Sequence, residues 1–215
     1  MLDTVIFDMD GVICHTNPYH SKAFRAFFAK RNMYPAEAEF AEHMYGKNNS
    51  YIFSHFMGRS VTGEELQQFE NEKEGLFREI YKPHIEAIHG FVAFAEQLLE
   101  QGYKLGVATS APRANMDLII DSLGIRHVFD SMLGSEDVSR HKPDPMVYLK
   151  SCTNLGASPE TCLVFEDSYS GITAAQSAGM KVIGVLSSHG RDELPSCSYY
   201  IDQYDTTLLS KVSSL

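Results

Sequence analysis

Two carboxylates stand two residues apart near the start of the chain, directly after a short apolar segment. Asp8 and Asp10 follow residues 4–7, whose apolar and partly β-branched side chains predict a buried strand. Because side chains alternate along a strand, this spacing places both carboxylates on one side. One of them can then attack phosphorus while the other handles the proton of the leaving or entering group. Gly11 permits a tight turn that directs backbone N–H groups toward an anion, although turns rich in Asp and Gly are common at any strand end.

Hydroxyl and ammonium groups follow in two later segments. Thr109 and Ser110 come after an apolar stretch, and the Thr109 hydroxyl suits either a phosphoryl oxygen or the N-cap of a helix from Arg113. Lys142 precedes Pro143, which fixes the local backbone, and the lysine ammonium can neutralise phosphate charge. A single lysine is otherwise most often a solvated surface residue. Both segments are therefore candidates for binding a phosphoryl group.

A second pair of carboxylates follows another apolar segment, at residues 162–165. Glu166 and Asp167 offer the oxygen ligands that Mg²⁺ prefers, whereas the same residues with Ser168 can instead cap a helix before Gly171. Helix capping alone does not require a Lys-Pro pair together with two pairs of carboxylates. We therefore interpret the acids, hydroxyls and amine that follow successive strands as one phosphoryl-transfer site.

Strands and helices must alternate to bring these groups together. We expect strands at residues 4–7, 105–108, 132–133, 162–165 and 182–185, and helices at residues 91–101, 113–123, 145–155 and 171–178. This alternation predicts a parallel sheet with right-handed crossovers, which binds ligands at the carboxyl ends of its strands.

The stretch that follows the first strand shows helical patterns only. We expect helices at residues 18–31, at residues 50–56, and from a capping box at Thr62 to about residue 81. The predicted organisation is a core of residues 1–14 and 82–215 that carries a helical insert of residues 15–81.

Charge and composition exclude several classes of protein. The formal net charge of the 215 residues is −10, which argues against nucleic-acid binding through a basic field. No apolar run approaches the roughly 20 residues of a membrane span, and the start of the chain lacks the pattern of a signal peptide. The four cysteines form no CxxC pair, so we expect reduced thiols in a cytoplasmic protein. From the charge and the absence of a long apolar run, we expect that it binds neither nucleic acid nor a membrane.

With these motifs in place, the chain resembles the haloacid dehalogenase-like (HAD) hydrolase superfamily, specifically its β-phosphoglucomutase-like branch. The resemblance covers nearly the whole chain and rests on four motifs in the right order: residues 5–13, Thr109, Lys142-Pro143, and Glu166-Asp167-Ser168 with Gly171-Ile172. It implies an α/β fold with a Rossmann-like parallel sheet core and an inserted helical cap domain. It also implies a Mg²⁺-dependent enzyme that acts on a small phosphorylated metabolite.

The resemblance further implies a role for each motif residue. Asp8 would be the nucleophile and Asp10 the general acid and base. The implied phosphate-binding residues are Thr109, Ser110 and Lys142. The implied Mg²⁺ site consists of Asp8, the Asp10 carbonyl and Asp167, with Glu166 close by.

Residues of the insert would meet the substrate in this branch. Thr16 and His20 stand four residues apart at the start of the first insert helix, where both can face the cleft, although His20 can instead be a half-buried helix residue. Lys73 matches a cap lysine that contacts the substrate, or else it is a solvated residue of a charged helix.

Two positions depart from the mutases of this branch. Asn49 stands three residues after Gly46, where mutases carry an Arg for the phosphate that is not transferred. Lys47 supplies charge nearby but lacks the bidentate fork of an Arg. His15 replaces a usual Asp at the hinge. These departures favour a phosphatase of a small phosphorylated metabolite, with a sugar phosphate as the first candidate, over a phosphoglucomutase-type mutase.

A receiver-type signalling module is an alternative of a different class, because it also combines a parallel sheet with clustered Asp residues, a Thr or Ser, and a Lys. Such modules are shorter, lack a helical insert after the first strand, and need no acid two residues beyond the phosphoacceptor. A non-catalytic binding protein on the same scaffold would not need all four motifs. An enzyme is therefore the preferred reading.

Overall fold

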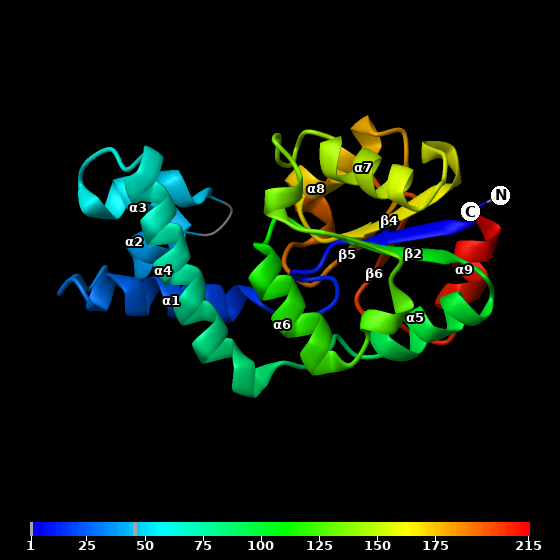
Figure 1. The fold of residues 1–215 in the computed structure, drawn as a ribbon, viewed down its shortest axis with the longest axis horizontal. Helices are drawn as coiled ribbons and strands as arrows, with labels where there is room; N and C mark the ends of the chain where they lie inside the picture. Colours follow the sequence, from blue (N-terminus) through cyan, green and yellow to red (C-terminus); the bar gives the residue numbers. More distant parts are fainter. Residues whose placement is uncertain (1, 45–46) are drawn as a thin grey trace. The chain divides into compact units, whose positions relative to one another are not determined.

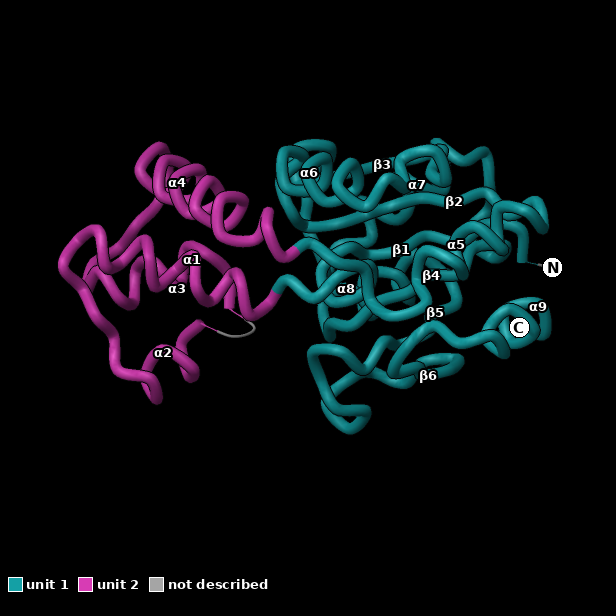
Figure 2. The backbone as a smooth tube through the Cα atoms, turned by 90° about the horizontal axis from the view of Figure 1, so that it is seen from below, with its two compact units in different colours: residues 1–16, 85–215 teal, residues 17–84 magenta. Residues whose placement is uncertain are grey.

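The computed structural model describes residues 2–44 and 47–215 (Figure 1). The chain divides into two compact units, a core of residues 1–16 and 85–215 and a helical unit of residues 17–84 (Figure 2). The sequence placed these divisions at residues 14/15 and 81/82.

The core is built on one parallel sheet. Its strands are β1 (Thr4–Phe7), β2 (Lys104–Ala108), β3 (Ser131–Leu133), β4 (Cys162–Glu166), β5 (Lys181–Val185) and β6 (Tyr199–Ile201). Their order across the sheet is β3-β2-β1-β4-β5-β6, and every neighbouring pair is parallel. The first five strands were expected within one residue at each end, whereas β6 was not expected, because this short edge strand has no alternating pattern.

Helices cover both faces of this sheet. The core helices are α5 (Phe91–Glu100), α6 (Arg113–Leu123), α7 (Met146–Asn154), α8 (Tyr169–Ser177) and α9 (Leu208–Ser214). Figure 1 shows α7 and α8 on one face and α5, α6 and α9 on the other. Only α9 among them was not expected. Short 3₁₀ turns lie at Lys82–His84, Arg126–Val128, Ser135–Asp137, Pro159–Thr161 and Arg191–Glu193.

Alternation along the strands divides the buried side chains between these two layers. Ile6 packs in an aliphatic cluster with residues of α7 and α8. Phe7 points to the other face, where its ring stacks on Phe165 at 5.0 Å and meets Phe91 edge-on at 5.2 Å. Tyr204 joins this aromatic layer, and its hydroxyl donates to the Val12 carbonyl at 3.0 Å. These contacts anchor the end of β1 and the turn after it to the aromatic layer of the core.

The helical unit contains α1 (Asn17–Ala29), α2 (Glu37–Met44), α3 (Asn49–Met57) and α4 (Gly63–Tyr81). A cluster rich in Phe residues forms its interior. The expected helices correspond to α1, α3 and α4, whereas α2 was missed, because its eight residues bury only Phe40 and Met44. The capping box at Thr62 is wrong: α4 begins after Thr62, but the threonine side chain makes no capping hydrogen bond.

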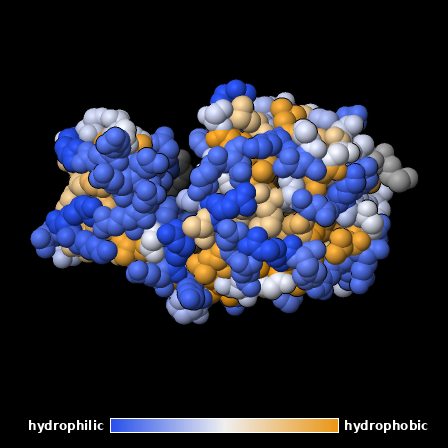
Figure 3. All heavy atoms as spheres, in the orientation of Figure 1, coloured by the Kyte–Doolittle hydropathy of each residue, from blue (hydrophilic) through white to orange (hydrophobic). Residues whose placement is uncertain are grey.

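The surface shows no single dominant apolar patch on the face drawn in Figure 3, where hydrophobic side chains are scattered among hydrophilic ones. Among the residues that the structure describes, the exposed large side chains of this class include Tyr34, Tyr51, Leu99, Leu149, Tyr169 and Tyr199. Across residues 2–44 and 47–215, every helix is too short or too polar to cross a membrane.

Candidate active site

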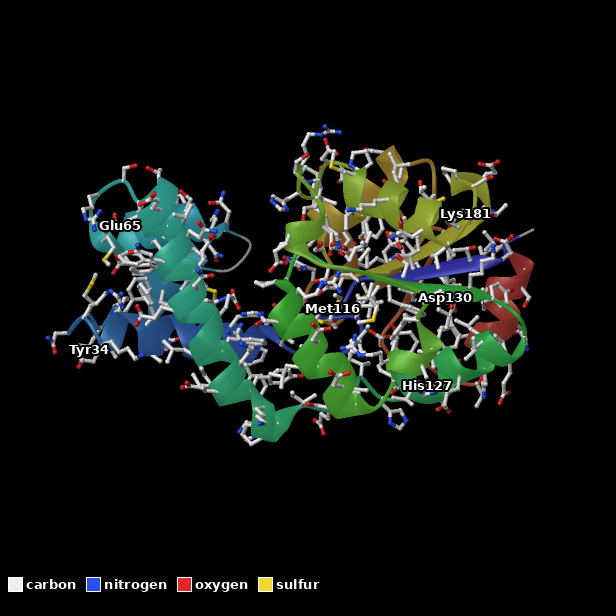
Figure 4. The ribbon with its side chains drawn as sticks, viewed as in Figure 1. Tyr34, Glu65, Met116, His127, Asp130 and Lys181 are labelled. Atoms are coloured by element: carbon white, nitrogen blue, oxygen red, sulfur yellow. The ribbon has the colours of Figure 1, made fainter. Side chains whose placement is uncertain are left out.

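The carboxyl ends of the strands carry the expected polar residues. Asp8 follows β1, Thr109 follows β2, and Asp167 follows β4. Because the strands are parallel and adjacent, these residues meet at one edge of the core. The residues that precede or begin strands, such as Asp130 and Lys181, lie at the opposite edge (Figure 4).

Asp8 occupies a buried position beyond β1. Its backbone N–H donates to the Phe165 carbonyl at 3.0 Å, which extends the pairing of β1 with β4 by one residue. The residue is only 6% exposed, and the Lys142 ammonium lies 2.5 Å from its Oδ1 atom. A carboxylate held by the backbone of a central strand and paired with a cation is suited to act as a nucleophile.

Lys142 connects three strand ends. Its Nζ atom donates to Asp8 Oδ1, to the Ala108 carbonyl at 3.0 Å and to Glu166 Oε1 at 2.7 Å. These three contacts use the three hydrogens of the ammonium. The side chain is only 4% exposed, so the reading of Lys142 as a solvated surface residue is wrong.

Glu166 is fixed by further hydrogen bonds. The Tyr148 hydroxyl of α7 donates to Oε1 at 2.9 Å, and both the N–H and the hydroxyl of Ser168 donate to Oε2 at 2.9 Å. A Cβ at Gly171 would overlap this carboxylate, so any larger residue there would have to displace Glu166 from its present position. Ser168 also caps α8 by accepting from the Gly171 N–H, which confirms the capping reading, whereas Mg²⁺ binding by Glu166 and Asp167 stays a prediction. Tyr148 was not singled out from the sequence, and only its place six residues after Lys142 could have drawn attention to it.

Burial and neighbouring charges together set the protonation of Asp8 and Lys142. Burial raises the pKa of the Asp8 carboxyl well above its usual range, and Lys142 opposes that shift. The negative charges of Glu166, Asp10 and Asp167 raise it further. Burial lowers the pKa of Lys142, but the charges of Asp8 and Glu166 outweigh burial and hold that pKa above its usual range. Lys142 is therefore charged, and further positive charge would help to keep Asp8 ionised.

The turn after β1 is tight. The N–H groups of Val12, Ile13 and Cys14 all point to the Met9 carbonyl at 2.8–3.3 Å. Gly11 has a φ of 74°, and a Cβ at this position would overlap the Asp167 carboxylate. The turn reading is confirmed, and the turn brings Gly11 against the end of β4. The N–H groups of residues 11–14 all donate to backbone carbonyls, so the expectation that these groups are directed toward an anion is wrong.

Asp167 is bound by a loop that sequence reasoning missed. The Ser188 hydroxyl is hydrogen-bonded to the Asp167 side chain, and His189 Nδ1 lies 3.1 Å from the Asp167 carbonyl. Ser187 donates through its hydroxyl to the Gly11 carbonyl. All three residues follow β5, and a strand end in a parallel sheet is the one signal that could have found them.

Thr109 and Ser110 differ in their surroundings. Thr109 is 2% exposed, and its hydroxyl accepts from the Ala111 N–H at 3.0 Å, whereas Ser110 is exposed. Helix α6 does begin at Arg113, but Pro112 occupies its N-cap, so Thr109 as the cap of this helix is wrong. The role of Thr109 and Ser110 in phosphate binding stays a prediction.

The donor set at this edge suits a hard divalent cation. Asp8, Asp10, Glu166 and Asp167 supply four carboxylates against the single ammonium of Lys142. Among the described residues, no three His, Cys, Asp or Glu side chains form a ready-made metal cluster. Mg²⁺ needs no such cluster, because it usually keeps several waters and takes one or two carboxylates together with substrate phosphate. The site therefore fits Mg²⁺.

Within the helical unit, Lys73 makes its own buried cluster. Its ammonium lies 2.8 Å from His20 Nδ1 and 2.7 Å from Glu74 Oε1, and it sits over the Phe24 ring at 4.6 Å. The side chain is 4% exposed, so Lys73 as a solvated residue is wrong. His20 is half-buried and stacks on Phe77 with the ring centroids 3.9 Å apart. The alternative reading of His20 is confirmed, and a substrate role for both residues stays a prediction.

The other candidate substrate residues lie before α1 or near the start of α3. Thr16 lies buried just before α1 rather than in its first turn, and His15 is exposed. Asn49 begins α3 and donates through its side-chain amide to Glu70 Oε1 at 3.1 Å. Lys47 is exposed, with its ammonium 5.8 Å from the centre of the Tyr51 ring. Gly46, used to align the mutase arginine, lies outside the described residues.

We expect Asp167→Asn to stabilise the metal-free protein increasingly as pH rises from about 5 to about 8. Burial, aided by the charge of Glu166, raises the pKa of Asp167 to about 7 from its usual 3.8. Between these values the folded state keeps a proton that the unfolded state has released, so stability falls with rising pH and levels off above about 7. The Asn side chain avoids this loss and still accepts from Ser188. Its advantage should therefore grow by about 2.5 kcal/mol over this range.

Urea unfolding in the presence of a chelator measures this difference. Asp121→Asn is the matched control, because the hydrogen bond from Arg126 lowers the pKa of Asp121, so that it titrates below the tested range. An Asp167→Asn advantage that is the same at both pH values would contradict the prediction.

Comparisons with known proteins agree with this geometry. The family model described as haloacid dehalogenase-like hydrolase matches residues 5–185. A Thermotoga maritima protein named phosphorylated carbohydrates phosphatase is 31% identical over 192 residues, which are 87% of each chain. The solved structure of a HAD hydrolase of family IA, variant 3, from Entamoeba histolytica has a TM-score of 0.90 and 25% identity, with both chains fully covered. A β-phosphoglucomutase from Clostridium difficile has a TM-score of 0.82 and 23% identity, covering 100% of this chain and 98% of the other, which is a likeness of fold.

Proposed function

Since the chain belongs to the haloacid dehalogenase-like hydrolases, in their β-phosphoglucomutase-like branch, we propose that it is a magnesium-dependent phosphatase of a small phosphorylated metabolite, with sugar phosphates as the favoured class. The observation that carries the proposal is the buried contact of 2.5 Å between Asp8 and Lys142 at the end of β1. Family membership also removes the receiver-type signalling module from consideration.

The proposed reaction begins with the Asp8 carboxylate. One of its oxygens attacks phosphorus, the bond from phosphorus to the leaving oxygen breaks, and Asp10 gives its proton to the leaving alcohol. Lys142 offsets the repulsion between the two anions, and Thr109 and Ser110 offer hydroxyls to the phosphoryl oxygens. Mg²⁺, held by Asp8, the Asp10 carbonyl and Asp167 with Glu166 close by, would supply further positive charge there.

Hydrolysis of the phosphorylated Asp8 completes the cycle. Asp10, now ionised, takes a proton from water as the water oxygen attacks phosphorus, and the bond between phosphorus and the Asp8 oxygen breaks. Inorganic phosphate leaves, and both carboxyl groups return to their starting states. The proposal thus gives Asp10 two proton transfers in opposite directions, while Asp8 forms and then releases the bond to phosphorus.

Asn49 supports water, rather than a second sugar hydroxyl, as the acceptor. A mutase must release a bisphosphorylated intermediate and rebind it in reverse, which calls for a second phosphate site. The Asn49 amide carries no charge and is already bonded to Glu70. Three arginines of the helical unit are engaged in ion pairs: Arg25 with Glu37 at 2.6 Å, Arg31 with Glu72 at 2.6 Å and Arg59 with Glu65 at 2.5 Å.

The test compares the two products from one substrate. Given β-glucose 1-phosphate, a trace of the 1,6-bisphosphate and Mg²⁺, the protein should release inorganic phosphate at least about tenfold faster than it forms glucose 6-phosphate. The factor follows because a bidentate, charge-assisted contact of a mutase arginine is typically worth about 1.5–3 kcal/mol.

A panel of phosphorylated metabolites, followed by phosphate release, then identifies the preferred substrate. Fast formation of glucose 6-phosphate with little free phosphate would instead establish the mutase, and Lys47 or Lys73 would be the first cap residues to replace. Absence of phosphate release from every member of the panel, with Mg²⁺ in excess, would contradict the phosphatase itself.

A further inference from the structure

The loop after β5 contacts both segments of the proposed metal site. Ser187 donates to the Gly11 carbonyl in the turn after β1. The next two residues, Ser188 and His189, bind Asp167 at its side chain and at its backbone carbonyl. One tripeptide thus connects two loops that are more than 150 residues apart in the sequence.

Packing leaves little freedom at this junction. A Cβ at Gly11 would overlap the Asp167 carboxylate and would lie 2.8 Å from the Ser188 hydroxyl oxygen. The turn after β1, the end of β4 and the loop after β5 are therefore in mutual contact. A side chain larger than glycine at position 11 would have to displace Asp167 or Ser188.

The two contacts on Asp167 fix different parts of the residue. The hydrogen bond from Ser188 favours one orientation of the carboxylate, whereas His189 holds the backbone. Because a carbonyl oxygen can only accept, His189 Nδ1 must carry the hydrogen in this contact. The ring of His189 therefore acts here as a donor and not as a metal ligand through Nδ1.

We propose that Ser187, Ser188 and His189 are positioning residues that hold the turn after β1 and Asp167 at the separation a magnesium ion requires. The inference rests on the proposed function, because it assumes the metal. Mg²⁺ demands nearly ideal octahedral geometry at short distances, so its affinity depends strongly on how well the ligands are placed. Residues that orient metal ligands typically affect metal affinity by about 10–100-fold.

The first test measures Mg²⁺ binding without substrate. The melting temperature is followed as Mg²⁺ is titrated into chelator-treated wild type, Ser188→Ala and the control Ser210→Ala. Ser210 is an exposed serine of α9 whose hydroxyl donates to the carbonyl of Thr207, the residue just before this helix. We expect Ser188→Ala to raise the Mg²⁺ concentration at half of the full shift by about tenfold or more, and Ser210→Ala to leave it unchanged.

The metal-free melting temperature separates positioning from general stabilisation. If Ser188 is a positioning residue, the metal-free melting temperature of Ser188→Ala should be close to that of Ser210→Ala. The two variants should then differ only in the Mg²⁺ titration. An unchanged Mg²⁺ midpoint for Ser188→Ala, or a loss of melting temperature without metal that accounts for the whole difference, would overturn the inference.

A matched pair at His189 provides an independent second test. Asn places an amide donor near the position of Nδ1, whereas Gln places its amide near Nε2 and leaves the Asp167 carbonyl unbonded. We expect His189→Asn to bind Mg²⁺ like wild type and His189→Gln to need about fivefold more, which is the typical worth of one neutral hydrogen bond. Equal midpoints for the two variants would count against the inference.

These outcomes are distinct from a failure of the proposed function. If wild type shows Mg²⁺-dependent stabilisation and phosphate release while the Ser188 and His189 variants titrate like it, only the positioning role is lost. If wild type shows no stabilisation by Mg²⁺ at any concentration, the metal itself is wrong, and both proposals fall.

Discussion

Asp8→Asn should leave a folded protein with kcat lowered by about 10⁵-fold or more, the loss typical of removing a catalytic nucleophile. The amide has nearly the shape of the carboxylate, but it cannot form the covalent bond to phosphorus. The fold should tolerate the change, because burial already disfavours a charge at Asp8 and Lys142 keeps its contacts with Glu166 and the Ala108 carbonyl.

Two measurements check this result. Steady-state phosphate release gives kcat, with Asp202→Asn, an exposed aspartate near β6, as the control for the substitution itself. Acid quenching during turnover should trap phosphate on the peptide that contains Asp8 in wild type and none in the variant. A folded Asp8→Asn protein with nearly normal kcat would rule out Asp8 as the nucleophile.

Lys142→Met should destabilise the metal-free core by about 3–5 kcal/mol, the usual cost of removing one partner from a buried ion pair. Methionine fills a similar volume, so the loss comes from the charges of Asp8 and Glu166, which are left buried without their cation. Activity should fall as well, because the ammonium 2.5 Å from Asp8 offsets the repulsion of an incoming phosphate.

A double variant isolates the electrostatic cause of that loss. Adding Glu166→Gln to Lys142→Met removes one of the stranded charges, so the double variant should be more stable than Lys142→Met alone. Lys150→Met, at an exposed lysine of α7 that donates to the Asp137 carbonyl, should change the free energy of unfolding by less than about 0.5 kcal/mol. Equal losses for Lys142→Met and Lys150→Met would contradict the charge argument.

Local sequence patterns predicted most helices and strands of the core, because the start and end of such an element depend mainly on residues that are neighbours in the sequence. Helix α6 was expected at its observed bounds, Arg113–Leu123, since Gly124 with a φ of 69° ends it in a conformation that favours glycine. Helix α2 and strand β6 were missed for the converse reason, because short elements with few buried residues carry too little pattern to be distinguished from loops.

The order of strands and helices along the chain was enough to predict which polar groups meet at one edge of the sheet. Asp8, Thr109 and Asp167 each follow a buried apolar strand, and parallel strands that alternate with helices must bring their carboxyl ends together. That conclusion needs only the order of elements along the chain. The same reasoning could not say which of these groups touch one another.

Those contacts could be found only in the folded structure. It buried Lys142 between Asp8 and Glu166, set the Tyr148 hydroxyl on Glu166, and brought the loop after β5 onto Gly11 and Asp167. Each contact joins residues that lie far apart in the sequence, so its existence depends on the strand order β3-β2-β1-β4-β5-β6 and on the faces that α7 and α8 cover. No local pattern encodes these, because a side chain's partners across a fold are set by packing and not by its neighbours in the sequence.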